Sequence, residues 1–195
     1  MPVSRILPAP RLRTLSRAEG VLRSAGIAHA LIGGWATRAY GGERPTEDVD
    51  LLAADGRVLS DALWAPVRAS GMRVDVRVGD DDDPLLGVVR VGTRHALALV
   101  DIVVPRGQWC ASMLSRALSE GARVSLGGVE VCVVQPADLI VLKLSYSPKD
   151  RADIAAILLD DLDGRVRDQV DTRIHDLPAF QQQIWAALKR KLDPP

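Results

Sequence analysis

The sequence contains only two cysteines, Cys110 and Cys132, among 195 residues. Their separation excludes a CxxC metal or redox motif, and two thiols are too few for a disulfide-stabilised scaffold. The chain also lacks an apolar run long enough to span a membrane, and the arginine- and proline-containing segment 1–13 lacks the apolar centre of a signal peptide. We therefore expect a cytoplasmic protein without a membrane partner.

The chain also lacks an excess of either charge, because 25 basic residues balance 25 acidic ones. The total charge thus gives no sign of a nucleic acid, a membrane surface or an acidic partner, and such a partner would need a local patch. Aromatic residues make up only 4% of the chain, so we expect the tryptophans to pack internally rather than to form a base-stacking platform. The three histidines lack metal-ligand spacing. The tryptophans are Trp35, Trp64, Trp109 and Trp185, and the histidines are His29, His95 and His175.

The remaining composition, 47% hydrophobic and 26% charged, is typical of a globular protein. Apolar periodicity predicts helices over 15–24, 35–40, 58–69 and 109–120, and strands over 28–32, 49–52, 72–78, 88–91 and 95–104. A hairpin over 122–134 turns at Gly127 and Gly128, and the four acids from Asp80 to Asp83 predict a solvated turn. We expect an α/β (α+β) fold with a mixed central sheet flanked by helices.

From Pro136 onward the pattern is helical. We therefore divide the chain into a catalytic domain over 1–135 and a carboxyl-terminal helical bundle or cap over 136–195, packed on it. No internal repeat or low-complexity tract is present.

Asp48 and Asp50 stand two residues apart at the start of the apolar strand predicted over 49–52. Side chains at this spacing project from the same face of a strand, so both carboxylates can share one cation. Mg²⁺ prefers oxygen ligands and commonly binds through one or two carboxylates plus substrate phosphates. The pair predicts a metal site for a nucleoside triphosphate.

Asp101 interrupts the strongly apolar strand predicted over 95–104. A carboxylate in such surroundings carries a large desolvation cost unless it is paired or bound to metal. If its strand lies beside that of Asp50, three carboxylates converge, and they could hold two metal ions about 4 Å apart. Asp101 could also act as the general base.

Gly33 and Gly34 separate the strand at 28–32 from the helix at 35–40. Glycines at a helix start let a triphosphate approach the backbone N–H groups. Arg44 and Thr46 could add charge-assisted and hydroxyl contacts to the same phosphates. Taken singly, a DxD pair, a Gly-Gly turn and an apolar-flanked aspartate each have an ordinary structural explanation, whereas their order along the chain favours a catalytic site.

Three segments together resemble the signature of the DNA polymerase β-like nucleotidyltransferase superfamily: 32–36 (Ile-Gly-Gly-Trp-Ala), 44–51 (Arg-Pro-Thr-Glu-Asp-Val-Asp-Leu) and Asp101. The resemblance covers about the first half of the chain. It implies the nucleotidyltransferase fold, ATP or another nucleoside triphosphate as substrate, Mg²⁺ or Mn²⁺ as cofactor, and Asp48, Asp50 and Asp101 as metal ligands and catalytic residues. One departure is that Gly-Gly stands where the superfamily commonly has Gly-Ser.

Segments 135–143 and 148–153 further resemble the AbiEii-type branch, which includes toxins of toxin–antitoxin systems. This resemblance implies that Lys143 reaches the nucleotide phosphates and that Lys149 and Asp153 complete the site from the neighbouring helix. A solvated helix face with an i,i+4 ion pair between Lys149 and Asp153 is the alternative.

These observations predict a nucleotidyltransferase whose acceptor stays open. A transfer RNA acceptor would make the protein a toxin, with an antitoxin partner and a basic face near the cleft from Arg38, Arg44, Arg106 and Lys143. An aminoglycoside acceptor would instead need an acidic cleft, lined by Glu47 and by the acids at 80–83. A non-catalytic nucleotide-binding module of the same fold is the third reading, and retention of all three carboxylates argues against it.

Overall fold

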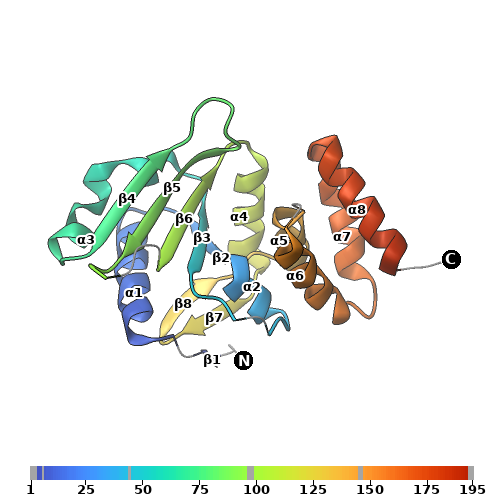
Figure 1. Ribbon diagram of the computed structural model, residues 1–195, viewed down its shortest axis with the longest axis horizontal. Helices are drawn as coiled ribbons and strands as arrows, with labels where there is room; N and C mark the ends of the chain where they lie inside the picture. Colours follow the sequence, from blue (N-terminus) through green and yellow to red (C-terminus); the bar gives the residue numbers. More distant parts are fainter. Residues whose placement is uncertain (1–3, 6, 44, 96–98, 145–146, 193–195) are drawn as a thin grey trace.

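The computed structural model describes residues 4–5, 7–43, 45–95, 99–144 and 147–192. Figure 1 shows a sheet-containing part on one side of the molecule and helices α5 to α8 on the other, with the carboxyl terminus beyond α8. No helix in these ranges is long and apolar enough to cross a membrane. The elements in chain order are β1 (Ser4–Arg5), α1 (Ala9–Ser24), β2 (His29–Ile32), α2 (Gly33–Ala39), β3 (Val49–Ala53), η1 (Gly56–Leu59), η2 (Asp61–Trp64), α3 (Ala65–Ala69), β4 (Arg73–Val78), β5 (Leu85–Gly92), β6 (Val100–Pro105), α4 (Trp109–Glu120), β7 (Arg123–Leu126), β8 (Val129–Cys132), α5 (Pro136–Leu142), α6 (Pro148–Leu159), α7 (Arg165–Arg173), η3 (Ile174–Asp176) and α8 (Ala179–Leu192).

The central sheet has five strands in the order β2-β3-β6-β5-β4. Strands β3 and β6 are parallel, and every other neighbouring pair is antiparallel. This mixed sheet confirms the predicted fold class. The hairpin β7–β8 lies in a second sheet with β1 rather than in the central one, and a bridge from Leu31 to Val133 joins the two sheets.

The two faces of the central sheet differ in burial because successive side chains of a strand point to opposite sides. One face is buried along β3, β5 and β6, and helix α1 packs against β5 and β6. The buried residues of α1 include Leu15, Ala18 and Leu22, which recur at helical spacing. The opposite face of β5 and β6 is only half-buried and contains the charged residues described below. The buried face is formed by Val49, Leu51, Val89, Val91, Val100 and Ile102.

Two predicted elements are shorter or more broken than expected. The helix predicted over 58–69 is two 3₁₀ turns followed by the five-residue α3, because Ser60 has an extended backbone and Pro66 can only begin a helix. The strand predicted over 95–104 begins only at Val100, and residues 96–98 lie outside the described part of the chain. Helix α1 begins earlier than predicted, at Ala9, with Pro10 in its first turn.

The carboxyl-terminal helices attach to the sheet-containing part through a buried charge cluster. Asp138 of α5 is fully buried and accepts hydrogen bonds from Arg116 of α4, Nε at 3.0 Å and Nη2 at 2.7 Å. Nη1 of Arg173 on α7 lies 3.0 Å from the same carboxylate. A buried carboxylate needs such compensation, so the cluster fixes α4, α5 and α7 relative to one another. The division into domains at 135 and 136 stays a prediction.

Only one edge of the central sheet is open within the described residues. The edge at β2 is covered by β8, since the Val134 N–H donates to the Leu31 carbonyl at 3.2 Å next to the bridge. The other edge is β4, which presents Arg73, Asp75 and Arg77 along one side of the strand.

Candidate active site

A row of charged residues crosses the half-buried face of the central sheet. Asp50 of β3 lies opposite Asp101 of β6, Asp101 lies opposite Arg90 of β5, and Arg90 lies opposite Asp75 of β4. Residues in register on neighbouring strands point to the same face, so these four side chains form one line. The strands containing Asp50 and Asp101 therefore lie side by side, which is the condition stated for convergence of the carboxylates.

Asp101 occupies an unfavourable position for a negative charge. Burial raises the pKa of its carboxyl above the ordinary value, the nearby charge of Asp48 raises this pKa further, and Arg90 opposes both effects. The influence of Asp48 places the two carboxylates in the same electrostatic neighbourhood, although Asp48 itself is exposed just before β3. The Oδ1 atom of Asp101 is buried without a hydrogen-bond partner among the described residues. An orphaned carboxylate oxygen of this kind is suited to a cation or to a proton.

Arg90 belongs to this site but was not predicted from the sequence. Its Nε lies 3.5 Å from Oδ2 of Asp101, a distance that gives charge attraction without a good hydrogen bond. The signal was a single arginine within the apolar strand predicted over 88–91, the same kind of interruption that identified Asp101. Arg90 limits the negative charge of the row.

Gly33 and Gly34, which the sequence predicted as a turn before the helix, are the first two residues of α2 and pack directly against the acidic strand β3. Gly33 has φ of +67°, and a Cβ atom there would lie 1.9 Å from Oδ2 of Asp50. A Cβ atom on Gly34 would lie 2.7 Å from Oγ1 of Thr46. Only glycine allows the backbone to approach Asp50 and Thr46 this closely. The structure thus brings together four of the predicted site residues: Gly33, Gly34, Thr46 and Asp50.

The loop before β3 is held locally. Thr46 Oγ1 donates to the carbonyl of Asp48 at 3.4 Å, which places the hydroxyl next to the acidic pair. Arg44, also predicted to contact phosphates, lies outside the described residues.

Lys143 and Asp153 form a buried ion pair between α5 and α6. Lys143 Nζ donates to Oδ2 of Asp153 at 2.6 Å and lies 3.5 Å from Oδ1 of Asp150. The Lys143 side chain is 8% exposed and that of Asp153 is 3% exposed, so both charges are neutralised within the protein. Lys149, in the first turn of α6, is exposed. The predicted i,i+4 pair of Asp153 with Lys149 is replaced by a pair with Lys143, and a role of these residues toward phosphates stays a prediction.

Two of the residues expected to form a basic face for an RNA acceptor, Arg106 and Arg38, make contacts within the protein. Arg106 donates to the carbonyls of Asp83 at 2.9 Å and Asp80 at 2.7 Å, so it closes the β4–β5 loop. The guanidinium of Arg38 stacks over Trp35 at 5.0 Å from the ring centroid. The tryptophans pack as predicted, since Trp35, Trp64 and Trp185 are buried.

The carboxylate oxygens of Asp48, Asp50 and Asp101 are of the type that a hard divalent cation prefers. Within the described ranges no group of three or more His, Cys, Asp or Glu side chains is arranged to hold a metal by itself. Mg²⁺ commonly takes only one or two protein carboxylates and obtains its other ligands from phosphates and water. The unpartnered Asp101 oxygen and the all-oxygen donor set agree with this mode of binding.

No protein-family model and no curated protein matches the sequence. Among solved structures, the antibiotic-resistance factor ANT(2'')-Ia matches 95% of this chain and 98% of its own with a TM-score of 0.54 at 16% identity. A nucleotidyltransferase-like protein from Paracoccidioides brasiliensis matches 92% of this chain and 91% of its own, with a TM-score of 0.48 at 19% identity. The lincosamide antibiotic adenylyltransferase LnuA matches 74% and 94%, with a TM-score of 0.45 at 10% identity. The first likeness shows that this chain shares the fold of ANT(2'')-Ia.

Proposed function

We propose that this protein is a magnesium-dependent nucleotidyltransferase that transfers a nucleoside monophosphate from a nucleoside triphosphate to a hydroxyl or phosphate of an acceptor. The observation on which the proposal rests is the register of Asp50 and Asp101 on adjacent parallel strands, with the charge of Asp48 close to Asp101. Three carboxylates at one end of two strands concentrate negative charge that a divalent cation and its bound triphosphate would balance.

Asp48 and Asp50 would hold the Mg²⁺ ion together with oxygens of the triphosphate. Asp101 lies in register with Asp50 on the adjacent strand, on the same face of the sheet. Mg²⁺, or Mn²⁺ in its place, would supply charge neutralisation on the phosphates and on the leaving pyrophosphate. The acceptor oxygen forms a bond to the α-phosphorus while the bond from this phosphorus to pyrophosphate breaks. The acceptor proton passes to Asp101, whose raised pKa makes its carboxylate a better base than an ordinary aspartate.

The triphosphate would lie along the Gly33–Gly34 turn, because the missing side chains leave backbone next to Asp50 and Thr46 open to it. Thr46 and Arg44 would contact the phosphates from the loop before β3. Lys149 would approach them from α6, positioned by the buried pair of Lys143 and Asp153.

The acceptor is proposed as one of two classes. The AbiEii-type resemblance favours transfer RNA, in which case the protein would act as a toxin with an antitoxin partner. The alternative acceptor is an aminoglycoside-type antibiotic. A different function, that of a non-catalytic nucleotide-binding module, is distinguished from catalysis by the assay below.

The test is an incubation of the full chain with Mg²⁺ and each α-³²P-labelled nucleoside triphosphate, with total transfer RNA or a panel of aminoglycosides as acceptor. We expect label to pass to one acceptor class and the transfer to stop when EDTA is added. Nucleotide binding without any labelled product would establish the non-catalytic reading. Absence of both product and metal-dependent nucleotide binding would remove the proposal.

A further inference from the structure

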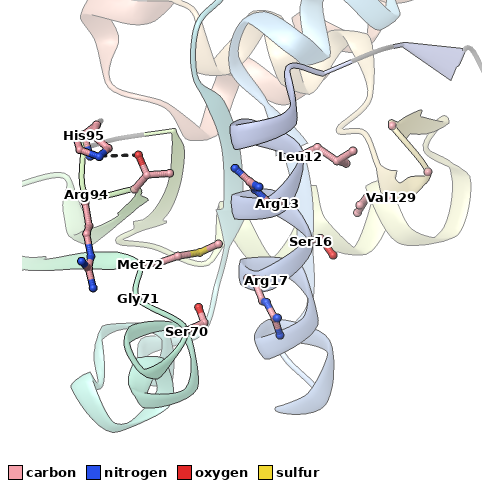
Figure 2. A pocket seen from close by; sticks show the side chains of 13 residues that line it. Leu12, Arg13, Ser16, Arg17, Ser70, Gly71, Met72, Arg94, His95 and Val129 are labelled. Carbon is pink, nitrogen blue, oxygen red and sulfur yellow. Dashed lines mark hydrogen bonds between the residues drawn. The ribbon is translucent and has the colours of Figure 1, made fainter.

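A second polar site lies on the opposite side of the sheet from the charged row. A cavity of about 850 Å³ is lined by residues of α1, by the segments 70–72 and 93–95, and by the hairpin turn at Gly127 and Gly128. We call it the α1 groove. Figure 2 shows Arg13 and Arg17 on α1 along one side, with Met72 and Arg94 on the facing side. The α1 groove lies beside the helix that covers the buried face of β5 and β6, whereas Asp101 and Arg90 project from the other face.

The groove is positively charged on both walls. Arg13 and Arg17 stand four positions apart, so they lie on the same face of α1, and Arg94 approaches from the β5–β6 loop. None of the described residues that line the groove is acidic, and the imidazole of His95 also lines it. None of the three arginines forms an ion pair within the described residues. Three unpaired guanidinium groups around one cavity attract a ligand with several negative charges.

The remaining lining indicates how such a ligand is held. Ser16, Ser70 and Thr93 supply hydroxyl groups, and the apolar contribution comes from Leu12, Met72 and Val129. The lining contains no Phe, Tyr or Trp, so bases have no aromatic surface on which to stack. Recognition in the groove would therefore be of the phosphate backbone and largely independent of sequence.

We propose that the α1 groove binds the phosphodiester backbone of a single-stranded nucleic acid. A repeating anion fits charges that are spread over two walls, and the cavity has the size of a ligand cleft rather than of a duplex-binding surface. Arginine is suited to this role because its planar guanidinium contacts phosphate oxygens bidentately. The inference goes beyond nucleotidyl transfer, since binding in the groove requires neither a nucleoside triphosphate nor Asp101.

The test measures fluorescence anisotropy of a labelled mixed-sequence single-stranded RNA with the full chain, without Mg²⁺ and without nucleoside triphosphate, over a range of salt concentrations. The groove variant combines Arg13→Gln, Arg17→Gln and Arg94→Gln. The matched control combines Arg123→Gln, Arg190→Gln and Lys191→Gln, which remove the same charge at exposed positions outside the groove. Thermal unfolding of both variants shows whether the fold is retained.

We expect the groove variant to bind RNA at least about tenfold more weakly than the control. The slope of log K against log salt concentration should become shallower by about 2, since each lost phosphate contact removes about 0.7 from it. An equal loss of RNA affinity in the two variants would show that binding depends on the total charge of the protein and not on the groove, and it would overturn the proposal. Unchanged binding by the groove variant would overturn it as well. Displacement of RNA by free tripolyphosphate at the same phosphate concentration would assign the groove to small anions instead. Because the measurement omits nucleotide and metal, its failure leaves nucleotidyl transfer untouched.

Discussion

Asp50 and Asp101 lie directly opposite each other on the parallel strands β3 and β6, each pointing to the half-buried face of the sheet. If this pair supports transfer, Asp50→Asn and Asp101→Asn should each lower the rate by about 10²–10⁴-fold, because the amide provides neither a metal ligand of full charge nor a base. The rate of label transfer from the nucleoside triphosphate is the measurement. Asp75→Asn is the matched control, since Asp75 belongs to the same row but lies on the edge strand and pairs with Arg77. Equal losses in all three variants would point to damage of the row rather than to chemistry.

Asp101→Asn should also make the protein more stable at neutral pH. The pKa of Asp101 is raised by burial, so between its ordinary value of about 3.9 and the raised value the folded state retains a proton that the unfolded state has released. The free energy of unfolding therefore falls as pH rises through this window, and the deficit persists above it. We expect the variant to melt a few degrees higher than the wild type at pH 7 in EDTA, measured by circular dichroism.

The stability difference should disappear when the pH is lowered below about 3.9, where both states of the wild-type aspartate are protonated. Mg²⁺ should narrow the difference at pH 7 by stabilising the wild type alone. A variant that is less stable at every pH would show that Arg90 outweighs the cost of burial.

Gly33→Ala should be more damaging than Gly26→Ala. Both glycines have a positive φ, +67° and +65°, but a Cβ atom at Gly26 meets no atom within 4 Å whereas at Gly33 it collides with the Asp50 carboxylate. Gly26→Ala should cost about 1–2 kcal/mol from backbone strain alone. Gly33→Ala should cost about 1–3 kcal/mol more from overpacking, and it should lower transfer by displacing Asp50. Urea unfolding measures the difference, and equal costs would show that Asp50 moves aside freely.

Lys143 and Asp153 should behave as a structural pair in stability measurements. Lys143→Met removes the ammonium that pairs with the buried Asp153 carboxylate, and Asp153→Leu leaves the buried ammonium with only the more distant Asp150, so each should destabilise by about 3–5 kcal/mol. The double variant should recover most of this loss, because two apolar side chains replace two paired charges. Chemical denaturation of the four proteins gives the coupling energy. If the double variant is stable yet binds nucleotide more weakly than the wild type, the pair also positions α6 for the phosphates.

The acidic and glycine residues of the candidate site could be predicted because each breaks a local pattern. A single aspartate in an apolar strand and two glycines before a helix are visible without knowledge of the fold. The pairing of β3 with β6 could be stated only as a condition, since strand order depends on contacts between segments about 50 residues apart. Arg90 was missed for the same reason, as its importance comes only from its position opposite Asp101.

The prediction of individual helices and strands failed where local signals were weak. The apolar spacing over 58–69 indicated one helix, but tertiary packing of Val58 and Trp64 holds short turns instead, with the Trp64 Nε1 donating to the Val58 carbonyl at 2.7 Å. Strand β1 has two residues and exists only because it pairs with β7, so nothing in its own sequence identifies it. Likewise, Asp153 pairs with Lys143 rather than with Lys149 because α5 packs on α6.

The open edge at β4 has a consequence for the behaviour of the protein in concentrated solution. An unpaired strand edge is a template on which a second copy can add its own strand, and such additions lead to aggregates. Along β4 the charges of Arg73, Asp75 and Arg77 alternate with Val74 and Val76. A second copy approaching in parallel register would bring like charges together, so this edge resists self-association most strongly when salt is low.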